Sequence, residues 1–182
     1  IALGMFSDAV WFLQRGDKTN LETITNRDAE INRQYFLLVR LIRSTIMDPR
    51  LAGIFNLENI DILDYRIAAN TLEIAGDTVV ELSESLIKSN LSKVELKKLH
   101  DFAKDMEEIQ IKSIDSFISN NRTLAINAIT LQRNNFEKIS KIRSSLESKK
   151  QISLSFFDLI YMFEKILQSW SDITDLVKPS YK

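Results

Sequence analysis

Apolar residues recur every three or four positions along almost the whole chain, and very few residues interrupt them. Among 182 residues there are only 4 Gly and 2 Pro, too few to supply the turns of a fold built from strands. A spacing of three and four places apolar side chains on one face of an α-helix. The sequence therefore predicts an all-α protein.

The pattern divides into six helical stretches separated by short polar breaks. The first stretch stops at Gly16–Asp17, and the second must end at Asp48–Pro49 because the residue before a proline avoids helical geometry. Ser92 and Glu95 have the spacing of a capping box and open the fourth stretch. The apolar positions of the six stretches span residues 3–13, 24–46, 60–86, 99–117, 124–146 and 156–177. The remaining breaks fall at Ser89–Asn90, Ser119–Asn121, Ser148–Gln151 and Pro179.

The six stretches fall into two groups of three that show a weak internal likeness. We expect two three-helix repeats, residues 1–90 and 91–182, because no linker is long enough to separate them into independent domains. Such repeats would pack along a common long axis as one six-helix bundle, with helices crossing near +20°. Trp11 and Trp170 stand at stripe positions and are expected to anchor the core or an interface, and polar Asn135 falls inside a stripe.

Composition excludes several function classes. Lys and Arg number 24 against 25 Asp and Glu, so this segment lacks the basic excess of a nucleic-acid binder. No apolar run approaches the ~20 residues that span a bilayer. There is no Cys, and His100 is the single histidine, which leaves no Ser-His-Asp set and no Glu-x-x-His pair of the kind that carboxylate-bridged metalloenzymes use. We therefore expect no catalytic activity.

One stretch carries a continuous polar line beside its apolar stripe. Its members stand three or four residues apart and are Arg66, Asn70, Glu73, Asp77, Glu81 and Glu84. Carboxylates at positions i and i+4 project within about 6 Å of each other, close enough to share a hard cation. Acidic lines on helices are also common as plain solvated faces. Spacing alone leaves both interpretations open.

Two segments resemble a known family. Residues 72–77, Leu-Glu-Ile-Ala-Gly-Asp, are similar to the Glu-Arg-Ile-Gly-Asp-type signature of the PhoU family of phosphate-uptake regulators. Residues 28–40, Asp-Ala-Glu-Ile-Asn-Arg-Gln-Tyr-Phe-Leu-Leu-Val-Arg, resemble the second-helix segment of archaeal members. Helix count, order and spacing agree with this resemblance over essentially the whole chain.

The resemblance implies a fold and a role that periodicity does not show. PhoU-like proteins are six-helix, two-repeat bundles, often dimeric, that act in the cytoplasm beside phosphate transporters and a sensor kinase. By this resemblance the chain is a non-catalytic regulator of phosphate uptake and homeostasis. Its partners would be a transporter subunit or the sensor kinase, together with a second copy of itself, with no insertion into the membrane.

The same resemblance implies a metal site in the first repeat. Many members bind metal through Glu/Asp-x-x-x-Asp pairs, which correspond here to Glu73 with Asp77 and to Asp28 with Asn32, where an amide replaces an acid. The ion would be divalent or iron-type. In the second repeat Glu164 is kept, but Gln168 replaces the second acid and Arg133 stands at the position equivalent to Asp28, so we expect little or no metal there.

Two alternatives stay open at this stage. The chain could be a helical interaction or scaffold module whose acidic line is only solvated surface. It could also be the sensor region of a transcriptional regulator, because archaeal proteins with such a second helix often carry an upstream AbrB-like DNA-binding domain. The chain begins at Ile1 with apolar residues already at helical spacing, and we expect it to be the C-terminal portion of a longer protein.

Overall fold

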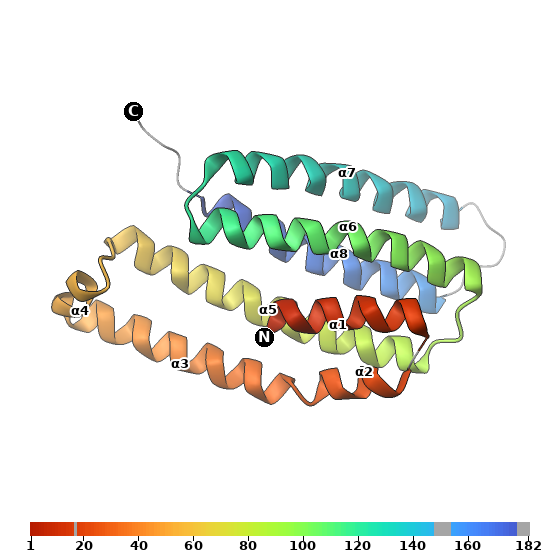
Figure 1. The fold of residues 1–182 in the computed structure, drawn as a ribbon, viewed down its shortest axis with the longest axis horizontal. Coiled ribbons are helices and arrows are strands. Elements are labelled where there is room, and N and C mark those ends of the chain that lie inside the picture. The colour runs from red at the N-terminus through yellow and green to blue at the C-terminus, as the bar shows by residue number, and fades with distance from the viewer. Residues whose placement is uncertain (17, 148–153, 178–182) are drawn as a thin grey trace.

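The computed structural model describes residues 1–16, 18–147 and 154–177, and within these ranges it contains eight helices and no strand (Figure 1). The helices are α1 (Ala2–Arg15), α2 (Lys18–Thr25), α3 (Asp28–Met47), α4 (Pro49–Ile54), α5 (Asn59–Lys88), α6 (Lys93–Ile118), α7 (Arg122–Glu147) and α8 (Leu154–Asp175). This confirms the predicted all-α class. The six predicted stretches correspond to α1, α3, α5, α6, α7 and α8, while α2 and α4 are additional short helices.

The helix ends follow the expected local chemistry. Gly16 takes a left-handed conformation (φ 68°) and its N–H donates to the Phe12 carbonyl, which closes α1. Asp48 ends α3 and caps α4, whose first residue is Pro49. The Ser92–Glu95 capping box is present, since the Ser92 N–H donates to Glu95 Oε2 at 2.8 Å. The predicted break at Ser148–Gln151 and the stop at Pro179 lie outside the described residues.

The predicted second stretch differs from the observed helices. Residues 26–27 form a turn that separates α2 from α3, although neither Gly nor Pro stands there. The Arg27 guanidinium forms an ion pair with Asp8 of α1. This contact ties the turn to a helix distant in sequence, so a tertiary interaction is associated with a break that helical periodicity does not signal.

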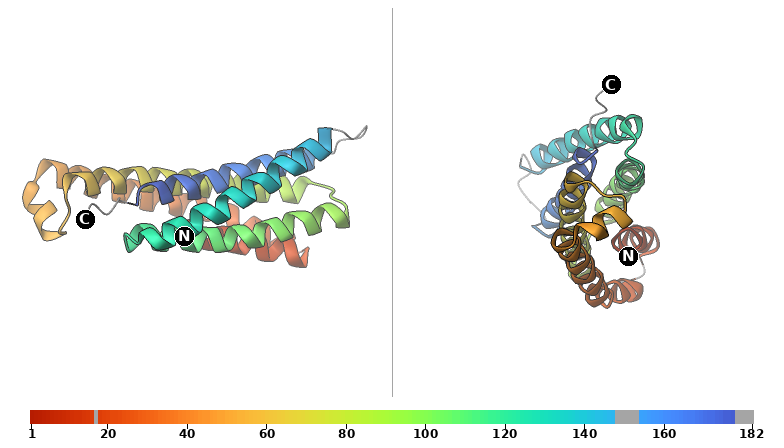
Figure 2. Two further views of the ribbon diagram at one scale, coloured as in Figure 1. Left: turned by 90° about the horizontal axis from the view of Figure 1, so that it is seen from above. Right: turned by 90° about the vertical axis from the view of Figure 1, so that its left-hand side faces the viewer.

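The long helices lie roughly along one axis in two groups of three (Figures 1 and 2). The first group comprises α1, α3 and α5, and the second comprises α6, α7 and α8. Contacts of α5 with α8 and of α1 with α6 join the groups. Viewed along the long axis, α3, α5 and α8 form one layer, and α1 and α6 lie on one side of it (Figure 2, right).

A single apolar core runs through both groups. Phe163 of α8 lies edge-on to Phe6 of α1 and to Phe102 of α6, with ring centroids 6.3 and 5.5 Å apart. Trp170 is fully buried, whereas Trp11 is 42% exposed and is covered by the Arg15 guanidinium at 4.2 Å from its ring. Of the two predicted anchors, only Trp170 lies in the core. In the described ranges no helix is long and apolar enough to span a membrane.

Candidate functional site

The predicted site residues lie where α3 crosses α5. The two helices approach closely there because residue 76 is glycine: a β-carbon at Gly76 would lie 2.3 Å from Cδ1 of Ile31. Close approach of the backbones brings side chains that flank this crossing within reach of each other. Asp28 and Asn32 come from the first half of α3, and Asp77 follows Gly76 on α5.

Two of the predicted acids meet across the crossing. The Asp28 carboxyl lies close enough to Asp77 to raise its pKa, and Asn32 Nδ2 donates to Asp28 Oδ2 at 3.2 Å. Asp77 Oδ1 is buried and has no hydrogen-bond partner. Three of the four predicted residues are therefore one connected cluster, and its deepest oxygen is an unused acceptor.

The cluster holds a proton unusually well. Burial, followed by the negative charges of Glu73, Asp28 and Glu81 and hydrogen bonding with Asp28, together raise the pKa of Asp77 to about 6. A hydrogen bond between two carboxyl groups needs one proton between them. Near neutral pH the pair would be ionised and would repel itself unless a cation were close.

Glu73 borders this cluster, because its negative charge raises the pKa of Asp77 more than the charge of Asp28 does. It precedes Asp77 by one helical turn and lines a neighbouring groove with Tyr35 and Gln34. In the described residues of the chain, no three Asp, Glu or His side chains come together as a ready metal-binding group. The crossing itself brings together two acids, Asp28 and Asp77, and the amide of Asn32.

These oxygen ligands suit a hard cation that needs only one or two carboxylates from the protein. Mg²⁺ and Mn²⁺ take oxygen ligands, and Mg²⁺ usually keeps several waters while one or two carboxylates hold it. The unpartnered Asp77 Oδ1 and the mutual repulsion of the two carboxylates favour such an ion. Asp28 and Asp77 would hold it, with the Asn32 amide carbonyl as a neutral ligand after rotation of its amide group.

A second polar network, next to the cluster, was not predicted from the sequence. Arg66 Nη2 donates to the Tyr35 hydroxyl at 3.0 Å, and that hydroxyl donates to Asn70 Oδ1 at 3.3 Å. The Arg66 guanidinium also lies over the Tyr35 ring, 5.4 Å from its centroid. Arg66 and Asn70 stand on the predicted polar line, but no local pattern indicates that Tyr35 joins them across the helix pair.

In the second group of helices, an arginine side chain neutralises Glu164, the acid that corresponds to Glu73. Arg143 Nη2 of α7 binds Glu164 Oε2 of α8 at 2.8 Å, and Gln168 donates to Asp172. Arg133 is not the neighbour of Glu164, because the adjacent residue Gln132 pairs with Thr174, ten residues beyond Glu164. The arginine that neutralises Glu164 is therefore Arg143, which the sequence did not single out.

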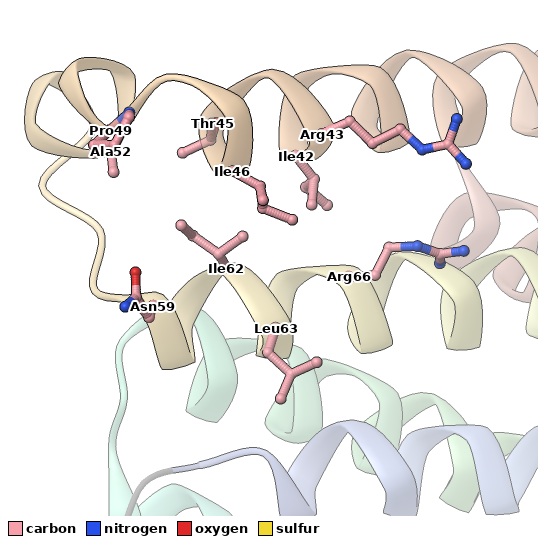
Figure 3. A pocket seen from close by; sticks show the side chains of 10 residues that line it. All are labelled: Ile42, Arg43, Thr45, Ile46, Pro49, Ala52, Asn59, Ile62, Leu63 and Arg66. Carbon is pink, nitrogen blue, oxygen red and sulfur yellow. The ribbon is translucent and has the colours of Figure 1, made fainter.

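Two hollows flank α3. One of about 590 Å³ lies between the far ends of α3 and α5, where Arg43 and Arg66 extend along the same side of it (Figure 3). The other, of about 660 Å³, is an apolar groove ahead of Ile1, lined by Leu37, Leu41 and Ile118 among others. In Figure 1 the α3–α5 pair extends past the start of α1.

Comparison with known proteins agrees with the fold and the predicted family. Residues 1–86 match the family model described as the PhoU domain. The chain also resembles the crystal structure of the phosphate transport system regulatory protein PhoU from Streptococcus pneumoniae, with a TM-score of 0.68 and 17% sequence identity over 97% of this chain and 82% of that one. No curated protein sequence matches. The sequence match covers residues 1–86, and the structural likeness shows that the fold is shared over nearly the whole chain.

Proposed function

We propose that this chain is a non-catalytic regulator of phosphate uptake that works in the cytoplasm by contact with other proteins. The observation that carries the proposal is the PhoU-domain match of residues 1–86 within a chain that adopts the PhoU fold almost throughout. A phosphate-transporter subunit or a sensor kinase is the partner that this family placement suggests.

The Asp28–Asp77 cluster gives the regulator a means to change state. When the pair holds a proton, α3 and α5 are joined by a carboxyl–carboxyl hydrogen bond. A divalent or iron-type cation bound there would replace this bond with ligand contacts from the same two helices. Because Phe36, Leu63 and Ile67 are exposed on those helices, the surface offered to a partner would then depend on metal.

The test compares phosphate uptake in cells of the source organism that lack the gene and carry either the native chain or a variant. We expect the native chain to lower uptake when phosphate is plentiful and to retain transporter or kinase subunits on affinity purification. The D28N/D77N variant should lose most of this effect. Asp115→Asn, at an exposed acid of α6, is the matched control and should behave as the native chain.

Two outcomes would contradict the proposal in different ways. If the native chain neither alters uptake nor retains any phosphate-transport component, the regulator role is wrong. If the native chain regulates and D28N/D77N regulates equally well, the cluster is only a solvated surface, and the chain is a plain interaction module.

A further inference from the structure

The hollow between the far ends of α3 and α5 is apolar at one end and cationic at the other. Near α4, Ile46 of α3 and Ile62 of α5 point toward each other across it (Figure 3). Arg43 and Arg66 come from the same two facing helices and extend to the end away from α4. The volume of about 590 Å³ falls within the ~300–1,000 Å³ of small-molecule pockets. We call this space the α3–α5 hollow.

The apolar end offers alkyl contacts more than hydrogen bonds. Ile42 and Ile62 are only 7% and 6% exposed, so this part of the lining is largely shielded from water. The Thr45 hydroxyl is already used as a donor, because it bonds to the Leu41 carbonyl of its own helix at 2.9 Å. A ligand that fills this end would therefore gain mainly by removing apolar surface from water.

The cationic end holds two arginines that have no acid partner. In the described part of the chain, neither Arg43 nor Arg66 forms an ion pair. Tyr35 positions Arg66, since its hydroxyl accepts from Nη2 at 3.0 Å and its ring lies under the guanidinium. A guanidinium has five N–H donors, so Arg66 retains donors for another acceptor. Two unpaired guanidinium groups at one end of an apolar space favour an anionic head group there.

We propose that the α3–α5 hollow binds a small single-chain amphiphilic anion, an alkyl carboxylate. Its carboxylate would accept hydrogen bonds from Arg43 and Arg66, and its alkyl chain would lie against Ile46 and Ile62. Inorganic phosphate would meet the arginines alone and leave the apolar end unused. The site goes beyond the proposed regulatory role and does not involve the Asp28–Asp77 cluster, so either proposal can fail without the other.

Methyl NMR of the native chain, titrated with octanoate, tests the site. The δ1 methyl groups of Ile42, Ile46 and Ile62 should shift and saturate, with a dissociation constant at or below about 1 mM. The methyl of Ile126, an exposed isoleucine on α7, should not shift. Octanol has the same chain without a charge and should bind about tenfold more weakly, because it lacks the charged contact with the arginines.

Substitutions separate the two ends of the hollow. Arg43→Gln and Arg66→Gln should each weaken octanoate about fivefold or more and leave the affinity for octanol unchanged. Ala52→Phe adds a ring at the apolar end and should weaken both ligands alike. Arg40→Gln is the matched control, because Arg40 is an exposed arginine of α3 outside the hollow. Helical circular dichroism checks that each variant folds.

Three results of the titrations would overturn the proposal. The first is the absence of a saturable shift at the three isoleucines with octanoate. The second is binding of octanol as tight as that of octanoate, or octanoate binding that neither Arg43→Gln nor Arg66→Gln weakens, because the arginines would then hold no head group. The third is inorganic phosphate that binds at least as tightly as octanoate, which would leave the apolar end without a role.

A membrane surface is the other occupant that the test must separate. Met47 and Ile54, beside the apolar end of the hollow in sequence, are 83% and 73% exposed. Sedimentation with phosphatidylglycerol vesicles supplies the comparison. A chain that sediments with these vesicles but does not bind octanoate would assign this end of the bundle to membrane contact and overturn the proposal.

Discussion

Cδ1 of Ile31 lies 2.3 Å from the place that a β-carbon on residue 76 would occupy. Gly76 is thus what allows α3 to approach α5 at the Asp28–Asp77 cluster. The closest atom is the end of a flexible side chain, so an alanine would displace Ile31 without requiring movement of the backbone.

Gly76→Ala should lower the free energy of unfolding by about 1 kcal/mol, since the cost of overpacking exceeds the ~1 kcal/mol gained by removing a helical glycine. Urea denaturation measures it. Ile31→Val removes the clashing carbon, so in that background Gly76→Ala should become neutral or stabilising. Gly4→Ala has no atom within 4 Å of its new carbon and should be stabilising by itself. Equal effects of Gly76→Ala in both backgrounds would show that Ile31 does not set the constraint.

The raised pKa of Asp77 predicts a particular dependence of stability on pH. The folded chain binds this proton with a pKa of about 6 and the unfolded chain with one near 3.8, so the stabilisation is complete below pH 3.8 and is lost as the pH rises through 6. Asp77→Asn keeps a donor for Asp28 and cannot ionise. It should remove this fall and stabilise the chain at pH 7 by about 1 kcal/mol, with solvent screening allowed for. Thermal unfolding of both proteins from pH 4 to 8 measures the effect. A midpoint temperature that changes with pH equally in the native chain and in the variant would contradict the prediction.

Metal binding should depend on the same two acids. Elemental mass spectrometry of the native protein and calorimetric titration with Mn²⁺ should show a site that Asp28→Asn or Asp77→Asn weakens tenfold or more, because each removes one of two charged ligands. Affinity should fall below about pH 6, where Asp77 is protonated. Glu164→Gln is the control, since Arg143 already occupies that carboxylate. Glu73→Ala should have the smaller effect of the two acids on α5.

The core between the two helix groups depends on Phe163. Phe163→Ala removes ring contacts with both Phe6 and Phe102 and should cost about 3–5 kcal/mol of unfolding free energy. Tyr161→Ala, two residues away at an exposed position, should cost less than about 1 kcal/mol. Chemical denaturation followed by circular dichroism compares them. A small loss at Phe163 would mean that the two groups are joined mainly by other contacts.

Local patterns predicted the helices well because amphipathic periodicity and end signals act over a few residues. Gly16, Pro49 and Ser92 each stop or start a helix as their chemistry requires. The break at residues 26–27 was missed, since it is accompanied by an ion pair between Arg27 and Asp8 and carries no glycine or proline.

Contacts between helices were harder to predict. A spacing of four residues places Glu73 near Asp77, but it cannot show that Asp28 of α3 also lies close to Asp77. The register of α7 against α8 likewise decides that Arg143 neutralises Glu164, and no local pattern shows this. The family resemblance indicated both Asp28 and Asp77 as site residues, which spacing alone does not do.

The position of α1 has a consequence for synthesis on the ribosome. Its apolar residues pack against α5 and α6, and Gln110 of α6 donates to the Leu3 carbonyl at 3.1 Å. Leu3 is therefore made about a hundred residues before its partner, an interval of roughly 5–20 s at ~5–20 residues per second. During that time Met5 and Phe6 of α1 lack the side chains of α6 that cover them in the folded chain. Nascent chains stalled before α6 should therefore be the ones that chaperones bind.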